Sequence, residues 1–448
     1  MSRRRRIAGP SLVTAAVLAA TTLATAVLVS GPSGAEPLAT SGRTYVVSPT
    51  GDDRGPGTAA APFRTIQRAV AAARPGVTIQ LQAGTYTGPF LIDGVSGTRN
   101  APITLEAAGD GPVVLTADLP PVPCNRSQPA ARTLNFGSGV DYWTVAGLRI
   151  RGGIGIKGTG WHAAFTWLKD RVSQADWRAR RAVPGHGPVA DEAAAKADLP
   201  QYLARQIGAP IDPADGISII GNTLTGRGIW TVLARQGVAA DNTITDIACG
   251  TGPAAWFNTF SDSWRVTHNV IDRVAASAYS HYMQEGIRLG SATSYVQVES
   301  NQVSDIHGTG RAFSTDVDAS YNTFSRNTAT DVYQGFNEQM SGWGNVWEFN
   351  TVRDFSSYGF AVRVMDGRLS QPSWDSSSYR ATFRCNAASG GPVALAVGAA
   401  RDDTFTGNSF AQVQLSDNLR AYWSAQGNHY DNLTAAPGAK PALSATGC

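Results

Sequence analysis

The chain has 448 residues, with 37 Lys and Arg against 34 Asp and Glu, a formal net charge of +3 and 48 glycines. A charge this close to zero excludes the broad electrostatic attraction by which strongly basic proteins bind nucleic acid. Many glycines with only 16% charged residues are typical of a long repetitive β structure, although the length also allows two ordinary domains.

The first 35 residues predict a cleaved export signal. Arg3 to Arg6 form a positive segment, residues 11–29 are apolar and uncharged, and residues 33–35 (SGA) supply a small-residue cleavage site. A retained membrane anchor is the alternative, since the apolar stretch approaches the roughly 20 residues that span a bilayer. Because the leader holds four arginines and no acid, its removal leaves 33 basic and 34 acidic residues. We expect a secreted, extracellular protein, exported by either the Sec or the Tat route.

The start of the mature chain predicts a strand, a turn and a helix. Residues 44–48 (TYVVS) have the composition of a strand, a glycine-rich turn follows, and Pro62 opens the helix. The apolar face of this helix carries Phe63, Ile66, Val70 and Ala73. We expect the helix to plug the open end of a coiled β structure whose first coil begins at residue 77.

Residues 155–213 have a different character from the rest of the chain. WLKDRVSQADWRARR and DEAAAKADLPQYLARQI show helical spacing and are rich in alanine and arginine. We interpret this segment as a helical insertion. Its tryptophans, Trp161, Trp167 and Trp177, either pack the insertion against the main body or form a lid over a groove.

From residue 218 to residue 430 one short pattern repeats: an apolar-x-apolar strand, an asparagine and a second short strand, as in ISIIGNTLT and VQVESNQVS. A coil of 20 or more residues cannot bury its own inward face, so neighbouring coils must stack about 4.8 Å apart. At the turn, stacked asparagines in left-handed geometry form a ladder of amides. The repeat predicts a single all-β domain over residues 36–448, a parallel β-helix solenoid. The scaffold asparagines are Asn222, Asn242, Asn269, Asn301, Asn327, Asn350, Asn386, Asn408 and Asn428.

The four cysteines of the mature chain are Cys124, Cys249, Cys385 and Cys448. An even number in an exported protein predicts structural disulfides, with three pairings open. Their spacing does not match a metal site.

A known superfamily shares the N-terminal part of this pattern. YVVSPTGDDRGPGTAAAPFRTIQRAVAAARPGVTIQLQAGTY, followed by NAPITLEAAGDGPVVL and GVDYWTVAGLRIRGG, resembles the cap and first coils of the pectate-lyase-like right-handed parallel β-helix superfamily. The resemblance covers most of residues 43–432. It implies right-handed coils and a secreted carbohydrate-active protein, but the superfamily contains lyases, hydrolases, epimerases, transferases and non-catalytic proteins.

Five segments share one strand register: GIWTVL, GIRLGS, AFSTDV, GFNEQM and GFAVRV. Side chains alternate along a strand, so the first apolar residue of each segment points into the core and the next points outward. An aromatic face stacks on a sugar ring, whereas amides and arginines bind hydroxyls and carboxylates. We interpret the outward side chains as a groove for a polysaccharide or oligosaccharide; the alternative is an ordinary solvated sheet face. The expected substrate-binding residues are Trp230, Arg288, Asn337, Gln339 and Arg363, with Ser314 beside them.

Carboxyls near this face make hydrolysis of glycosidic bonds the leading hypothesis, with Asp316, Glu338, Glu285 and Asp318 as candidate catalytic residues. Alternation places Glu338 in the core stack, so either a bulge turns it outward or it is protonated or paired inside. Carboxyls about 6.5 to 9.5 Å apart suit inverting hydrolysis, and carboxyls about 5 Å apart suit retaining hydrolysis. The candidate pairs are Asp316 with Glu338 or Glu285.

A calcium-assisted lyase acting on a uronate polymer is the alternative enzyme. EGIRLGSATSYVQVESNQVSD is similar to a segment of alginate-lyase and chondroitinase-type β-helix lyases, and the resemblance implies that Glu285 helps hold calcium, a candidate cofactor. The next coil reads FSTDVDAS and lacks the catalytic lysine of those families. Arg288 and Arg363 would neutralise the uronate carboxylate. The candidate bases are His281, Tyr282 and His307.

A non-catalytic carbohydrate-binding or surface β-helix protein is the third hypothesis. Carboxyls that are dispersed or bonded within the core would favour it. For all three hypotheses we expect a monomer that does not bind nucleic acid or, once the signal is removed, a membrane.

Overall fold

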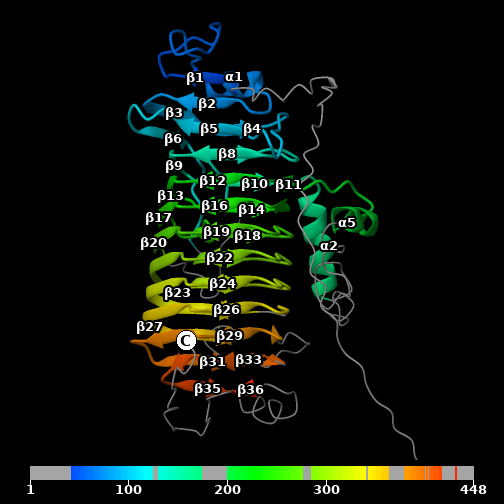
Figure 1. Ribbon diagram of the computed structural model, residues 1–448, viewed down its shortest axis with the longest axis vertical. Helices are drawn as coiled ribbons and strands as arrows, with labels where there is room; N and C mark the ends of the chain where they lie inside the picture. Colours follow the sequence, from blue (N-terminus) through cyan, green and yellow to red (C-terminus); the bar gives the residue numbers. More distant parts are fainter. Residues whose placement is uncertain are drawn as a thin grey trace, which may run out of the picture. The chain divides into compact units, whose positions relative to one another are not determined.

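Successive turns of the chain stack as coils along one axis, and paired strands of neighbouring coils run parallel (Figure 1). The computed structural model describes residues 42–124, 130–173, 199–275, 284–339, 342–362, 378–398, 400–401, 403–415, 429–430 and 448. The expected export signal lies outside the described residues, as do Trp177, His281, Tyr282, Arg363 and Asn428. The described chain is the all-β parallel β-helix that the repeat predicts.

The strands form three columns that run the length of the solenoid. The first column contains β1 (Thr44–Val47), β2 (Thr78–Leu81), β5 (Ile103–Ala107), β8 (Trp143–Ala146), β12 (Ser218–Ile220), β16 (Val238–Ala240), β19 (Arg265–Thr267), β22 (Gln297–Glu299), β24 (Thr323–Ser325), β26 (Val346–Glu348), β29 (Thr382–Arg384), β33 (Thr404–Thr406) and β36 (His429–Tyr430). The second contains β3 (Gly84–Gly88), β6 (Val113–Ala117), β9 (Arg149–Arg151), β13 (Thr223–Gly226), β17 (Thr243–Ile247), β20 (Val270–Val274), β30 (Ala387–Ser389) and β34 (Ser409–Phe410). The third contains β4 (Phe90–Ile92), β7 (Leu134–Phe136), β10 (Ile154–Lys157), β14 (Ile229–Val232), β18 (Ala255–Asn258), β21 (Glu285–Leu289), β31 (Val393–Val397) and β35 (Val413–Leu415).

Three long strands, β23 (Gln302–Thr315), β25 (Thr328–Glu338) and β27 (Thr351–Val362), bend at the corner and belong to both the second and third columns. Two short pairs complete the set, β11 (Ala214–Asp215) with β15 (Ala234–Arg235) and β28 (Ser378–Tyr379) with β32 (Ala400–Arg401). Aromatic rings stack in the core from coil to coil; Phe336, for example, lies 4.8 Å from Phe313 and 4.7 Å from Phe360 between ring centroids.

The asparagine ladder links the first column to the second. The backbone N–H and the side-chain Nδ2 of Asn301 both donate to Oδ1 of Asn327, each at 3.0 Å, and the same pattern runs from Asn222 to Asn408. One detail differs from the prediction. Within the described ladder the left-handed residue is the one before each asparagine, for example Ser300 with φ 56° and Arg326 with φ 55°. The asparagine itself is therefore free to direct its amide along the stack.

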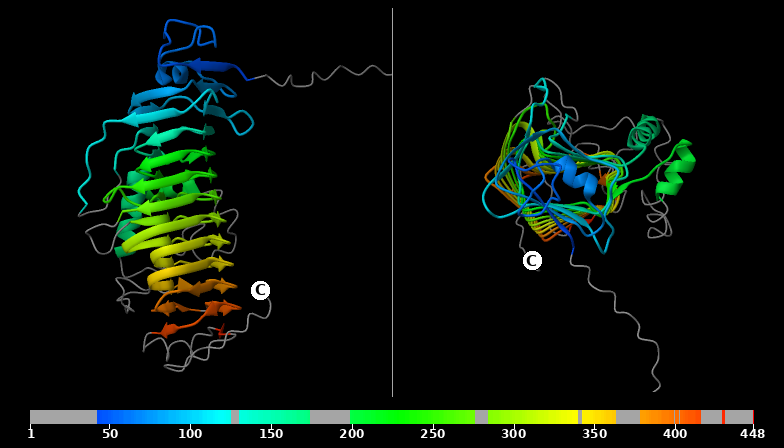
Figure 2. Two further views of the ribbon diagram at one scale, coloured as in Figure 1. Left: turned by 90° about the vertical axis from the view of Figure 1, so that its left-hand side faces the viewer. Right: turned by 90° about the horizontal axis from the view of Figure 1, so that it is seen from above.

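Helix α1 (Ile66–Ala72) covers one end of the coils (Figure 2). Ile66 and Val70 are buried in the main core, as predicted. The helix begins at Ile66, four residues later than the expected first helical residue Pro62, because Thr65 is its N-cap and accepts from the Arg68 N–H at 3.2 Å. Phe63 instead pairs with Val47 at the edge of the first column.

Two helices, α2 (Trp161–Ser173) and α5 (Leu199–Ile207), lie within the segment predicted to be a helical insertion. Leu168 and Leu203 pack on Leu233, Phe260 and Ala292, which belong to turns of three different coils.

Disulfides join Cys124 to Cys249 and Cys385 to Cys448, which settles the pairing that was open. Among the described helices, none is long and apolar enough to span a bilayer.

Candidate functional site

One continuous row of side chains crosses the coils on the outer side of the third column. We call it the outer row. The strand register aligns Trp230, Trp256, Arg288, Ser314 and Asn337 in that order. This confirms the shared register that the sequence predicts for four of these strands. Trp230, Arg288 and Asn337 are only 5%, 3% and 0% exposed, so this part of the row is not the ordinary solvated sheet face that was the alternative.

Arg288 is the centre of a buried ion-pair network. Its Nη1 lies 2.7 Å from Oε2 of Glu285, and its Nη2 binds Oδ2 of Asp316 on the next coil. Nη1 of Arg311 lies 2.9 Å from Oε1 of Glu285, and Nε2 of Gln339 donates to the same oxygen at 3.3 Å. Glu285, Arg288, Asp316 and Gln339, all expected at the site, are therefore brought together, whereas Arg311 was not expected.

The network fixes the protonation of its two innermost members. Burial raises the pKa of Glu285, but the charges of Arg288 and Arg311 outweigh it and hold this pKa below its ordinary value. Burial likewise opposes the charge of Arg288, yet Asp316 and Glu285 raise its pKa above the ordinary value. Both shifts favour the charged forms of Glu285 and Arg288, as in a buried ion pair.

A calcium ion at Glu285, which the resemblance implies, does not fit these contacts. Both carboxylate oxygens of Glu285 already bind guanidinium groups, and Arg288 and Arg311 place positive charge where the cation would lie. We therefore correct the assignment of Glu285 as a calcium ligand.

The outer row and two neighbouring residues, Asn258 and Arg311, carry buried polar atoms that lack a hydrogen-bond partner within the described structure. They are Nε1 of Trp230, Nε1 of Trp256, Oδ1 of Asn258, Nε of Arg288, Nε of Arg311, Oγ of Ser314 and Oδ1 of Asn337. A buried donor or acceptor without a partner costs roughly 1 to 3 kcal/mol. Seven such atoms gather beside this face of the third column.

The row has an aromatic end beside the inserted helices. The ring centroids of Trp230 and Trp256 are 6.5 Å apart, and Trp161 of α2 meets Trp230 edge-on at 5.8 Å. Nζ of Lys157 lies 5.2 Å from the centroid of the Trp230 ring. Trp161 thus packs the insertion against the aromatic end of the row.

Sequence reasoning missed Trp256, Asn258 and Arg311. The signal was available: every coil must contribute one strand to the third column, and AWFN is the apolar segment between the ladder residues Asn242 and Asn269. Arg311 stands directly before AFSTDV, in register with Glu285.

Glu338 lies on the other side of the strand, inside the solenoid. Its Oε1 accepts from Nδ2 of Asn345 and its Oε2 accepts from Nε1 of Trp347, both at 2.8 Å, and the residue is 1% exposed. The expected pairing of Asp316 with Glu338 across a substrate is therefore corrected. Of the two outcomes foreseen for Glu338, the structure shows pairing inside the core.

Burial raises the pKa of Glu338 to about 7, although the bonds from Asn345 and Trp347 oppose the shift. The folded protein thus keeps this proton up to about pH 7, whereas the unfolded chain releases it near the ordinary pKa of 4.5. We expect the free energy of unfolding to fall by about 3 kcal/mol as the pH rises through this window. Glu338→Gln removes that part of the pH dependence, which urea denaturation between pH 4 and pH 8 measures. Asp354→Asn, which changes a carboxyl that is exposed to solvent, is the control variant in the same denaturation series. If the free energy of unfolding fell with pH as steeply in Glu338→Gln as in the wild type, Glu338 would not be the group that carries the proton in the core.

Asp316 and Asp318 differ in accessibility. The Asp316 side chain is 17% exposed, so it reaches solvent at the row, whereas Asp318 is 2% exposed and occupies a left-handed position with φ 59° in the following turn. Asp316 is the better placed of the two for contact with a substrate.

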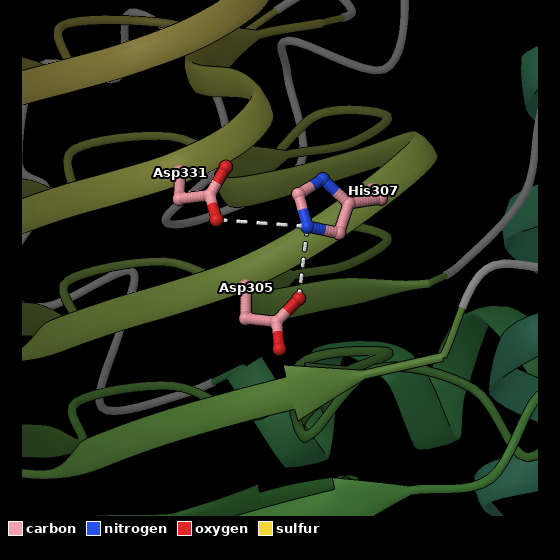
Figure 3. A group of neighbouring side chains, drawn as sticks. All are labelled: Asp305, His307 and Asp331. Atoms are coloured by element: carbon pink, nitrogen blue, oxygen red, sulfur yellow. Dashed lines mark ion pairs between the residues drawn. The ribbon is translucent and has the colours of Figure 1, made fainter.

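A second polar cluster lies at the bend that leads to the third column (Figure 3). Nε2 of His307 lies 2.9 Å from Oδ1 of Asp305 and 3.7 Å from Oδ2 of Asp331 on the next coil. His307 and Asp305 also line a surface hollow of about 420 Å³. All three side chains are at least 42% exposed. Because exposed groups of this kind are common without any ligand, we assign no site to them.

Comparisons with known proteins find similarities to two groups of proteins, by sequence over short segments and by structure over most of the chain. A family model described as "Protein of unknown function (DUF1565)" matches residues 49–89. A pectate lyase, PEL9, of Emericella nidulans is 42% identical over 81 residues, which is 18% of this chain and 20% of that protein. The matched part is therefore about a fifth of that relative.

Solved structures of similar shape are more distant in sequence. An alginate lyase from Paenibacillus sp. str. FPU-7 is 16% identical, with a TM-score of 0.44, and the match covers 83% of this chain and 97% of that one. Pectate lyase Pel9A is 13% identical, with a TM-score of 0.43 and coverage of 84% and 78%. The stacked parallel coils, the asparagine ladder and the end helix show that this chain is a parallel β-helix, and the local match to a pectate lyase agrees with the predicted resemblance to the pectate-lyase-like superfamily.

Proposed function

We propose that this chain is an extracellular carbohydrate-active protein that binds a polysaccharide or oligosaccharide along the outer row. The observation that carries the proposal is the set of unpaired buried donors and acceptors beside Trp230 and Trp256. Sugar hydroxyls both donate and accept, and sugar rings stack on indoles, so a carbohydrate supplies what the row lacks. The two disulfides and the expected export signal support an oxidising, extracellular setting.

Cleavage of the bound sugar chain is a second candidate function, and the position of Asp316 favours it. This carboxylate reaches solvent at the row and is held by Arg288, as a carboxylate that attacks a sugar or activates water requires. The hydrolase therefore stays ahead of the lyase, since both oxygens of Glu285, the residue expected to hold calcium in the lyase, already bind arginines. The inward position of Glu338 nevertheless strengthens the binding hypothesis relative to both.

An assay with neutral and acidic polysaccharides, in calcium and in chelator, tests both functions. Binding is measured by affinity electrophoresis, and cleavage by new reducing ends together with the ultraviolet absorbance of unsaturated uronates. We expect binding, and reducing ends without absorbance that fall by about 10² to 10⁴ in Asp316→Asn. Asp354→Asn is the matched control, because Asp354 is exposed on the second column and outside the row.

Three other results would change the proposal. Absorbance that depends on calcium would replace the hydrolase with a lyase. Binding without products would leave a carbohydrate-binding protein, and the absence of both from a broad panel would overturn the proposal.

A further inference from the structure

We propose that Arg311 is a positioning residue that acts, through the buried ion pairs, on the carboxylate of Asp316. The inference rests on the proposed function, namely on cleavage at Asp316. Of the four charged side chains of the network, only Asp316 reaches solvent, at 17% exposed; Glu285, Arg288 and Arg311 are 0%, 3% and 5% exposed. Arg311 therefore does not meet the substrate itself, and any effect on cleavage must pass through its neighbours.

A chain of ion pairs with alternating sign joins the two residues. Glu285 and Arg288 belong to β21, whereas Arg311 lies on β23 and Asp316 directly follows that strand. The two strands pair in parallel, with Glu285 opposite Arg311. Contacts run from Arg311 to Glu285 at 2.9 Å, from Glu285 to Arg288 at 2.7 Å, and from Arg288 to Asp316. A change at Arg311 thus reaches Asp316 through two side chains of the neighbouring coil.

The two oxygens of Glu285 are divided between the two arginines. Oε1 accepts from Nη1 of Arg311, and Oε2 accepts from Nη1 of Arg288. An arginine and a carboxylate otherwise favour a two-point contact, in which one guanidinium binds both oxygens. Because Arg311 occupies Oε1, Arg288 binds Glu285 through one nitrogen only. Its Nη2 is therefore available for Oδ2 of Asp316.

This one-sided contact leaves the second oxygen of Asp316 for the substrate. Arg288 binds Oδ2, and within the described part of the chain Oδ1 makes no hydrogen bond. A carboxylate that is held by one oxygen keeps a fixed direction for the other, as attack on a sugar or activation of water requires. If Arg288 turned both nitrogens to Glu285, Asp316 would lose its partner and sample several rotamers. We expect such a loss to lower kcat rather than the affinity for the substrate.

The test measures initial rates of reducing-end release by the full chain over a range of concentrations of xylan, glucomannan, galactan, polygalacturonate and alginate. On the polysaccharide that the wild type cleaves, we expect Arg311→Met to lower kcat about 10- to 100-fold and to keep KM within about twofold. Arg311→Lys is expected to retain most of the wild-type kcat. Only one nitrogen of Arg311 binds Glu285, so a lysine ammonium supplies the same charge at that oxygen.

Stability is measured on the same proteins by urea denaturation, and the rates are compared where each variant is fully folded. Arg311→Gln is a second uncharged variant, and we expect its kcat to match that of Arg311→Met. Arg326→Met is the matched control. Arg326 also binds a glutamate of the neighbouring coil, Glu299 at 3.1 Å, but this pair is exposed and lies outside the row, so the variant keeps the wild-type kcat.

Three results would overturn the inference. If folded Arg311→Met and Arg311→Gln lost stability but kept the wild-type kcat, Arg311 would be a structural residue only, and the proposed cleavage would stand. If Arg311→Lys lost as much kcat as Arg311→Met, the charge at Glu285 would not be the cause. If the wild type released no reducing ends from any of the five polysaccharides, the proposed cleavage and the positioning role would both be wrong.

Discussion

Glu285→Gln is expected to lower the free energy of unfolding at pH 7 by about 3 to 5 kcal/mol. The glutamine keeps the shape of the side chain but withdraws the negative charge from two arginines that are nearly inaccessible to water. In the variant, Arg288 still pairs with Asp316, whereas Arg311 loses the carboxylate to which its Nη1 binds. A buried charge whose partner is removed costs several kcal/mol. Urea denaturation of wild type and variant measures the difference.

An exposed pair provides the comparison. Glu299 binds Arg326 at 3.1 Å, with side chains 42% and 59% exposed, and Glu299→Gln is expected to change stability by about 0 to 1 kcal/mol. Because the pKa of Glu285 is lowered on folding, its stabilising effect is present at neutral pH and is lost as the pH falls below the ordinary value of 4.5. Equal, small effects of the two variants would contradict the role of the buried network.

Asn327→Ala is expected to lower the free energy of unfolding by about 4 kcal/mol, because the side chain of Asn327 forms hydrogen bonds that link three successive coils. Its Nδ2 donates to the Val298 carbonyl at 2.8 Å and to Asn350, and its Oδ1 accepts two bonds from Asn301. The alanine leaves buried backbone groups of Val298 and Asn301 without partners, at roughly 1 to 3 kcal/mol each, in addition to the bonds lost. Chemical denaturation followed by far-ultraviolet circular dichroism measures the loss.

The control for this prediction is Asn100→Ala. Asn100 is exposed in a turn, so we expect a change within about 0.5 kcal/mol. If Asn327→Ala were equally mild, neighbouring coils would have to rearrange enough to replace the ladder bonds, and the ladder would not be the fixed scaffold described here.

The features that repeat along the chain were predictable from the sequence. Each coil carries its own strand pattern and asparagine, so the stacking, the shared register and the ladder follow from local residues repeated many times. The inward direction of Glu338 also followed from alternation, because it depends only on the neighbouring positions of one strand.

The features that depend on a single contact were not predictable in the same way. Whether Glu338 turns outward at a bulge or pairs inside depends on Asn345 and Trp347, which belong to the next part of the coil. The burial of Trp230 and Arg288 depends on what covers the strands, which alternation does not reveal. The pairing of four cysteines likewise depends on the path of the whole chain.

The edge of the first column at β1 has a consequence for assembly. A stack of parallel strands ends in a row of free backbone groups, which invites another chain to add a strand and so to build a fibre. Here the chain covers this edge itself: the Val46 N–H donates to Gly57, the Ser48 N–H donates to Phe63, and the Phe63 N–H donates back to Val46. Because these donors and acceptors are already used, a second molecule cannot add a strand to β1 at Val46 and Ser48, which protects this edge of the first column from end-to-end polymerisation.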